Sequence, residues 1–172
     1  MYEYKPILRH KKKFFLGDFP SYVYFFLSVF GLASFTNESI ADQSVVKVSI
    51  VDPPKEVANG TGIGVQFVIQ DGWHIYGKEA GELGLPTKIL VEGGSVGDYS
   101  WPPTEVFKNP GVPDSFGYHG TVVVGVGIEG GDEVIGKEVS VKAKWLACSK
   151  DACIPSSTSI KGVVKKVENQ SH

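Results

Sequence analysis

The feature that most constrains this chain is a series of short runs in which apolar and polar residues alternate. Alternation with period two is typical of strands with one buried face, and glycine and proline between the runs indicate turns. No segment after residue 41 keeps a helical period for more than two turns. The runs lie at residues 45–51, 63–70, 73–76, 87–94, 121–128, 138–147 and 157–167. Seven or eight such strands predict an all-β fold, an immunoglobulin-like antiparallel β-sandwich.

One long connection interrupts this series. Residues 99–120 contain four prolines and show no sustained alternation, so we expect them to form a loop. Loops longer than about 12–15 residues inside a compact domain are usually functional. This segment is therefore a candidate part of the functional site.

The first 41 residues differ from the rest of the chain. A basic cluster at residues 9–13 precedes an apolar stretch at residues 21–35, and small residues follow at Ser39 and Ala41. This order predicts a secretory signal peptide over residues 1–41. The apolar stretch is shorter than the roughly 20 residues that span a bilayer, and an uncleaved anchor is the alternative. We expect a folded domain at residues 42–167 and a disordered tail at residues 168–172.

Charge and composition exclude several functions. Residues 1–41 carry a net charge of +2 and the whole chain −2, so the exported part carries −4. Arg9 is the only arginine, which argues against nucleic-acid binding. Met1 is the only methionine, so the exported part offers no thioether to a soft metal such as copper. Export also places the cysteines where disulfides form and persist.

Cys148 and Cys153 are the only cysteines, and the four residues between them fit a hairpin loop. A disulfide across so short a loop stabilises a fold by only about 2 kcal/mol. The spacing alone leaves a structural staple and a redox pair equally open. A metal site is disfavoured, because the exported part offers only His74, His119 and His172 as histidine ligands and no second cysteine pair is present.

Four ordered motifs resemble one known family. They are DGWHIYGKEAGELGLPT at 71–87, WPPTEVF at 101–107, FGYHGTVVV at 116–124 and VKAKWLACSKDACIP at 141–155. Together they resemble the N-terminal periplasmic domain of DsbD-type thiol:disulfide interchange proteins, in the branch that includes the ScsB-like proteins. The resemblance spans roughly residues 44–165, which is nearly the whole exported part.

The resemblance implies a cofactor-free thiol–disulfide oxidoreductase module with an immunoglobulin-like fold. Such a domain takes electrons from a thioredoxin-like domain fed by a membrane thiol carrier, and passes them to periplasmic acceptor proteins. By this resemblance Cys148 and Cys153 form the redox pair, and Cys153 forms the mixed disulfides with partners. The implied location is the periplasm, with inner-membrane anchoring if the leader is not cleaved.

The resemblance also implies an aromatic cap loop over the cysteine pair. The matching residues are Glu105, Phe107, Phe116 and Tyr118, with Phe107 as the first choice for the covering ring and Phe116 as the second. Trp73 and Tyr76 are candidates for lining the site. For Trp73, a place in the sandwich core is the favoured alternative, because aromatic residues dominate cores.

Two departures from the family pattern bear on function. The best-known member has one more residue between its cysteines than this chain. The sequence ends at His172 without the membrane carrier and thioredoxin-like domain that normally follow. We therefore expect either that separate proteins supply the electrons or that the module has another role. The alternative role is a non-catalytic periplasmic binding module with a structural hairpin disulfide.

Overall fold

The computed structural model describes residues 44–82, 84–108 and 110–168. The predicted leader, and all of the predicted tail except Glu168, lie outside these residues. Within the described residues, no helix has the length and apolar character needed to cross a membrane. The elements are β1 (Val46–Val51), β2 (Thr61–Ile69), β3 (His74–Gly81), β4 (Lys88–Glu92), β5 (Val96–Ser100), β6 (Glu105–Phe107), β7 (Ser115–Tyr118), β8 (Thr121–Ile128), η2 (Gly131–Val134), β9 (Glu138–Cys148), β10 (Cys153–Val163) and β11 (Lys165–Lys166).

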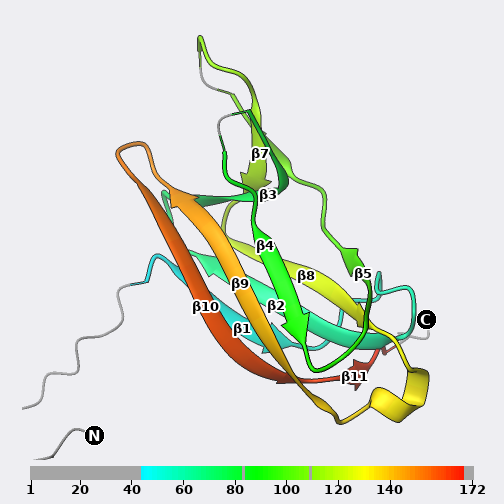
Figure 1. Cartoon of the computed structure of the whole chain (residues 1–172). Coiled ribbons are helices and arrows are strands. Elements are labelled where there is room, and N and C mark those ends of the chain that lie inside the picture. Colours follow the sequence, from blue (N-terminus) through cyan, green and yellow to red (C-terminus); the bar gives the residue numbers. More distant parts are fainter. Residues whose placement is uncertain (1–43, 83, 109, 169–172) are drawn as a thin grey trace, which may run out of the picture. The chain divides into compact units, whose positions relative to one another are not determined.

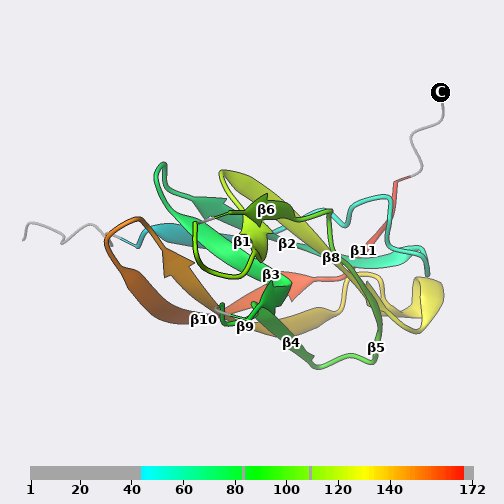
Figure 2. The ribbon, with the colours of Figure 1, turned by 90° about the horizontal axis from the view of Figure 1, so that it is seen from above.

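The strands form two antiparallel sheets that pack face to face (Figures 1 and 2). The first sheet has the order β1-β2-β8-β5, with β11 also paired to β2. The second has the order β10-β9-β3-β7-β6, with β4 also paired to β9. The predicted immunoglobulin-like β-sandwich is confirmed.

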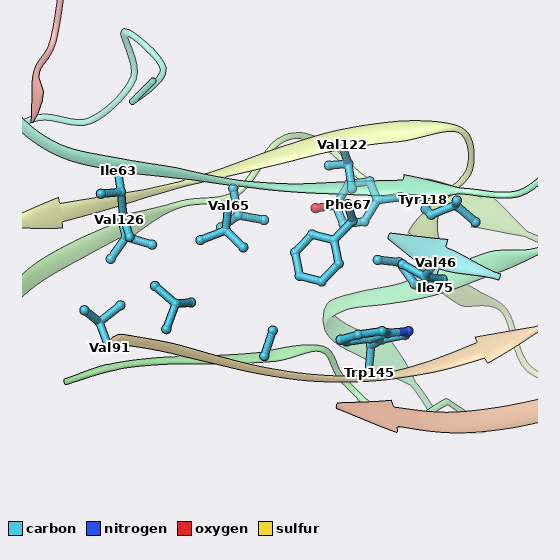
Figure 3. Close-up of a cluster of buried hydrophobic side chains, with 14 of the residues drawn as sticks. Val46, Ile63, Val65, Phe67, Ile75, Val91, Tyr118, Val122, Val126 and Trp145 are labelled. Carbon is cyan, nitrogen blue, oxygen red and sulfur yellow. The ribbon is translucent and has the colours of Figure 1, made fainter. Parts of the chain in front are cut away.

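The core lies between the sheets because each central strand buries every second side chain. Val65 and Phe67 of β2 face Val141, Ala143 and Trp145 of β9, and none of these side chains is more than 6% exposed. The rings of Phe67 and Trp145 meet edge to face with centroids 5.8 Å apart (Figure 3). Burial of each large apolar side chain contributes about 1.5–3 kcal/mol, so this layer fixes how the sheets pack.

The prediction that residues 99–120 form a loop is wrong. This segment contains the last residues of β5 and the complete β6–β7 hairpin, whose strands pair through Glu105↔Gly117 and Phe107↔Ser115. β7 also pairs with β3, which extends to Gly81, beyond the run expected at residues 73–76. These strands are short, and long-range pairing rather than local alternation determines them.

Candidate redox site at the tip of the β9–β10 hairpin

The two cysteines face each other at the closed end of a long hairpin. Cys148 is the last residue of β9 and Cys153 the first of β10, as the sequence predicts, and they are directly opposite in the register. A disulfide joins them, and their Cα atoms lie 4.1 Å apart. Ser149 closes the turn: its backbone N–H donates to the Ala152 carbonyl at 2.8 Å, and its hydroxyl accepts from the backbone N–H groups of Asp151 and Ala152, each at 3.2 Å.

The two sulfur-bearing residues differ sharply in exposure. Cys148 is 2% exposed and packs in a small cluster with Tyr76 and Ala80, whereas Cys153 is exposed. The Tyr76 hydroxyl donates a hydrogen bond to Cys148 Sγ at 3.7 Å. A thiolate arriving from outside therefore has Cys153 as its accessible target, and Cys148 has a hydrogen-bond donor ready for the charge that it would acquire as the leaving group.

The cysteines lie on the outer face of the second sheet. Trp145 and Ala147 point into the core, so Leu146 and Cys148, which alternate with them, point outward. His74 on β3 is the register partner of Cys148 and shares its face. The hairpin tip and strands β3 and β7 lie at the same end of the sandwich (Figure 1).

Four rings form a continuous cluster beside Cys148. The His74 centroid lies 5.3 Å from that of Tyr76, 4.5 Å from that of Phe107 and 5.7 Å from that of His119. Phe107 and His119 are themselves 4.8 Å apart. Burial, and to a smaller extent the neighbouring His119, lowers the pKa of His74 below its ordinary value. His74 is thus favoured in its neutral form, which suits packing against Phe107.

The β6–β7 hairpin brings Phe107 into this cluster. Glu105 lies on the same face of β6, and its Oε2 is 3.2 Å from Nδ1 of the exposed His119. A side chain at Gly117 would collide with the Ile75 carbonyl oxygen and with the Phe107 ring, at 2.9 Å from Cε2. Glycine at this position therefore allows Phe107 to lie across β7.

Other candidate residues have different positions. Phe116 and Tyr118 alternate with Gly117 and point to the opposite face. Tyr118 is buried in the core, where its hydroxyl donates to the Pro102 carbonyl at 2.7 Å, and burial raises its pKa. Trp73 is partly buried and packs against the main core, the alternative that its sequence context favoured.

Sequence reasoning considered His74 and His119 only as metal ligands and missed their place beside the cysteines. Strand alternation carried part of the signal, since His74 and Tyr76 are two residues apart and share a face. The pairing of His74 with Cys148 joins positions far apart in the chain and has no local signature. Within the described ranges, no group of three His, Cys, Asp or Glu residues is arranged to hold a metal ion.

The protein is an antiparallel β-sandwich with a disulfide on the outer face of one sheet, in which Cys153 is exposed and Cys148 is buried. The family model for the N-terminal domain of thiol:disulfide interchange protein DsbD matches residues 38–165. The chain therefore belongs to the family of DsbD N-terminal domains, and the resemblance found in its motifs is confirmed. No curated protein matches the chain.

Two solved structures with TM-scores above 0.5 agree with this chain in fold. The N-terminal periplasmic domain of ScsB from Proteus mirabilis is 22% identical with a TM-score of 0.54, over 70% of this chain and 47% of that one. This chain thus spans about half of the ScsB structure that it matches. The complex of the DsbD and PilB N-terminal domains from Neisseria meningitidis gives 14% identity and a TM-score of 0.51, over 77% and 96% of the two chains. The reduced DsbD N-terminal domain of that organism gives 16% and 0.45, over 70% and 90%.

Proposed function

We propose that this domain is a periplasmic thiol–disulfide exchange module that relays two electrons from a dithiol donor to acceptor proteins through Cys148 and Cys153. The observation that carries the proposal is the unequal exposure of the pair: Cys153 is exposed, whereas Cys148, opposite it on β9, is only 2% exposed. Exchange requires one sulfur that a partner can reach and one that leaves and later resolves. A purely structural bridge has no need of this difference.

The reaction follows from the geometry in two steps. A donor thiolate attacks Cys153 Sγ, the Cys148–Cys153 bond breaks, and Cys148 leaves as a thiolate with the Tyr76 hydroxyl as its hydrogen-bond donor. The donor's second thiolate then attacks its own sulfur in the mixed disulfide and releases Cys153. The donor becomes a disulfide and this domain a dithiol. With an acceptor the direction reverses: Cys153 attacks, and Cys148 resolves the mixed disulfide.

We assign Phe107 as the covering ring of the site. It packs on His74, which lies directly opposite Cys148, and the Glu105–His119 contact ties its strand to the turn after β7. Both groups of that contact are about half exposed, so it contributes on the order of 1 kcal/mol or less and opens easily. Tyr118, held in the core, anchors the base of the hairpin and does not move with the cap.

The proposed partners are thioredoxin-like proteins and a membrane thiol carrier. Proteins of both kinds carry a reactive dithiol that can reach the exposed Cys153 of this domain. Support comes from the solved complex of a DsbD N-terminal domain with a PilB N-terminal domain. The periplasmic location is supported by the ScsB structure, described as a periplasmic domain.

Trapping of the mixed disulfide tests the proposal. The full chain is incubated with a thioredoxin whose resolving cysteine is replaced by serine, and the products are resolved on non-reducing gels. The single-cysteine variants Cys148→Ala and Cys153→Ala are first activated with Ellman's reagent, so that the thioredoxin thiolate displaces thionitrobenzoate from the remaining cysteine. The native disulfide and activated Cys148→Ala should form the mixed disulfide, and activated Cys153→Ala should not. A normal yield of mixed disulfide with Cys153→Ala would overturn the assignment of Cys153.

A further inference from the structure

A groove of about 430 Å³ crosses the outer face of the second sheet beside the cysteine hairpin. Leu85 and Pro86 form its wall before β4, and Pro155 forms its wall on β10. Leu85 is 60% exposed and lines the groove together with Pro86 and Pro155, so the exposed apolar surface is continuous there. The groove therefore offers an apolar surface that the described part of the chain does not cover.

The groove lies close to the reactive sulfur. Pro155 lies two residues after Cys153 on β10, so both point to the same face about 7 Å apart. Leu146, the register partner of Pro155, is also packed beside Cys148. A protein that places a cysteine on Cys153 thus covers the groove with the residues that flank that cysteine.

Two lysines give the groove a positive charge. Lys88 and Lys144 are register partners on β4 and β9, both are exposed, and both line the groove. Like charges directly opposite on a sheet are destabilising. Within the described residues neither lysine has an acidic partner, whereas Lys142 on the same face of β9 is bridged to Glu92 at 2.7 Å. The sheet thus neutralises Lys142 and leaves the facing Lys88–Lys144 pair, with Lys144 four residues before Cys148 on β9.

We propose that this Lys88–Lys144 groove recognises a segment of the exchange partner that carries an apolar side chain and a carboxylate next to its reactive cysteine. The inference rests on the proposed function, which it extends to the chemistry of the partner. The apolar side chain contacts Leu85 and Pro155, and the carboxylate accepts charge-assisted hydrogen bonds from the two ammonium groups. Such a charge pattern mainly accelerates association.

Peptide thiols of defined charge test the inference on the oxidised full chain. One synthetic peptide carries leucine and two glutamates after its cysteine, a second carries glutamines, and a third carries lysines at the same places. The peptide thiolate attacks Cys153 Sγ, and the released Cys148 thiol is capped with a maleimide and counted by mass spectrometry. Rates are divided by the thiolate fraction of each peptide, because neighbouring charges alter that fraction.

At low ionic strength the glutamate peptide should react about tenfold faster than the glutamine peptide. Lys88→Glu/Lys144→Glu should reverse the order and favour the lysine peptide, and Lys144→Gln should lose part of the preference. In 0.5 M salt the preference should fall below about twofold, because screening shortens the reach of exposed charges. The control Lys47→Glu/Lys55→Glu makes the same charge change on and after β1 of the other sheet, and it should retain the native preference.

The outcomes separate the two proposals. Equal rates for all three peptides, or the same preference in the groove and control variants, would overturn the groove inference while exchange at Cys153 stands. Failure of every peptide to form a mixed disulfide would overturn the proposed function itself.

Discussion

Replacement of Tyr76 by phenylalanine should slow the opening of the disulfide. The change keeps the ring that packs with Cys148 and removes only the hydroxyl that donates to its sulfur at 3.7 Å. A hydrogen bond to a charged group contributes about 1.5–3 kcal/mol. In the exchange transition state about half of the charge has developed, so the barrier should rise by about 0.7–1.5 kcal/mol. The rate should fall by about three- to thirteenfold.

The assay is the rate at which dithiothreitol reduces the oxidised full chain, followed by capping of the released thiols. Tyr99→Phe is the matched control, because the Tyr99 hydroxyl also makes one hydrogen bond, to the Ile89 carbonyl at 3.0 Å, on a different strand. Tyr99→Phe should reduce at the native rate. Equal rates for both variants and the native protein would refute a role for Tyr76 in stabilising the leaving thiolate.

Three further predictions follow from the site. Phe107→Ala should speed reduction by dithiothreitol severalfold, whereas Val106→Ala, on the opposite face of β6, should not; equal rates would remove Phe107 as a cap. Because burial lowers the pKa of His74 in the folded state, the unfolded chain binds more protons as the pH drops below the ordinary histidine pKa of 6.5. The free energy of unfolding should therefore fall as the pH drops through and below about 6.5. His74→Gln should reduce this loss between pH 7.5 and 5.5 in urea unfolding, and an unchanged pH dependence would contradict the argument. The cysteine pair should equilibrate with thiol buffers at about −180 to −270 mV; a potential below about −300 mV would indicate a resistant structural bridge and favour the non-catalytic binding module.

Much of the sandwich could be predicted because alternation reports burial directly. The run at 121–128 coincides with β8, and Val139, Val141, Ala143 and Trp145 of β9 are buried as the alternation predicts. The strands that were missed, β6 and β7 above all, are three and four residues long and lie in a proline-rich region. Their hydrogen bonds come from partners elsewhere in the chain, which no local pattern records.

The site was predictable only in part, for a similar reason. The hairpin position of the cysteines follows from local spacing, and the motifs drew attention to Phe107 and Tyr76. Which face each ring occupies depends on the register between β3, β7 and β9, so only the resemblance, and no local pattern, ranked Phe107 before Phe116. The lysine pair of the groove likewise exists only because β4 and β9 place two distant positions opposite each other.

The position of the disulfide at a hairpin tip also has a thermodynamic consequence. Folding and reduction of the disulfide form a closed thermodynamic cycle. The free energy by which the disulfide stabilises the fold therefore equals the free energy by which folding makes the disulfide harder to reduce. A ring of six residues, Cys148 to Cys153, adds only about 2 kcal/mol, which corresponds to a shift of the reduction potential by about 40 mV toward more negative values. The stability of the fold therefore depends only weakly on whether the pair is oxidised. In the proposed exchange cycle, oxidation and reduction of the pair should leave the packing between the sheets almost unchanged.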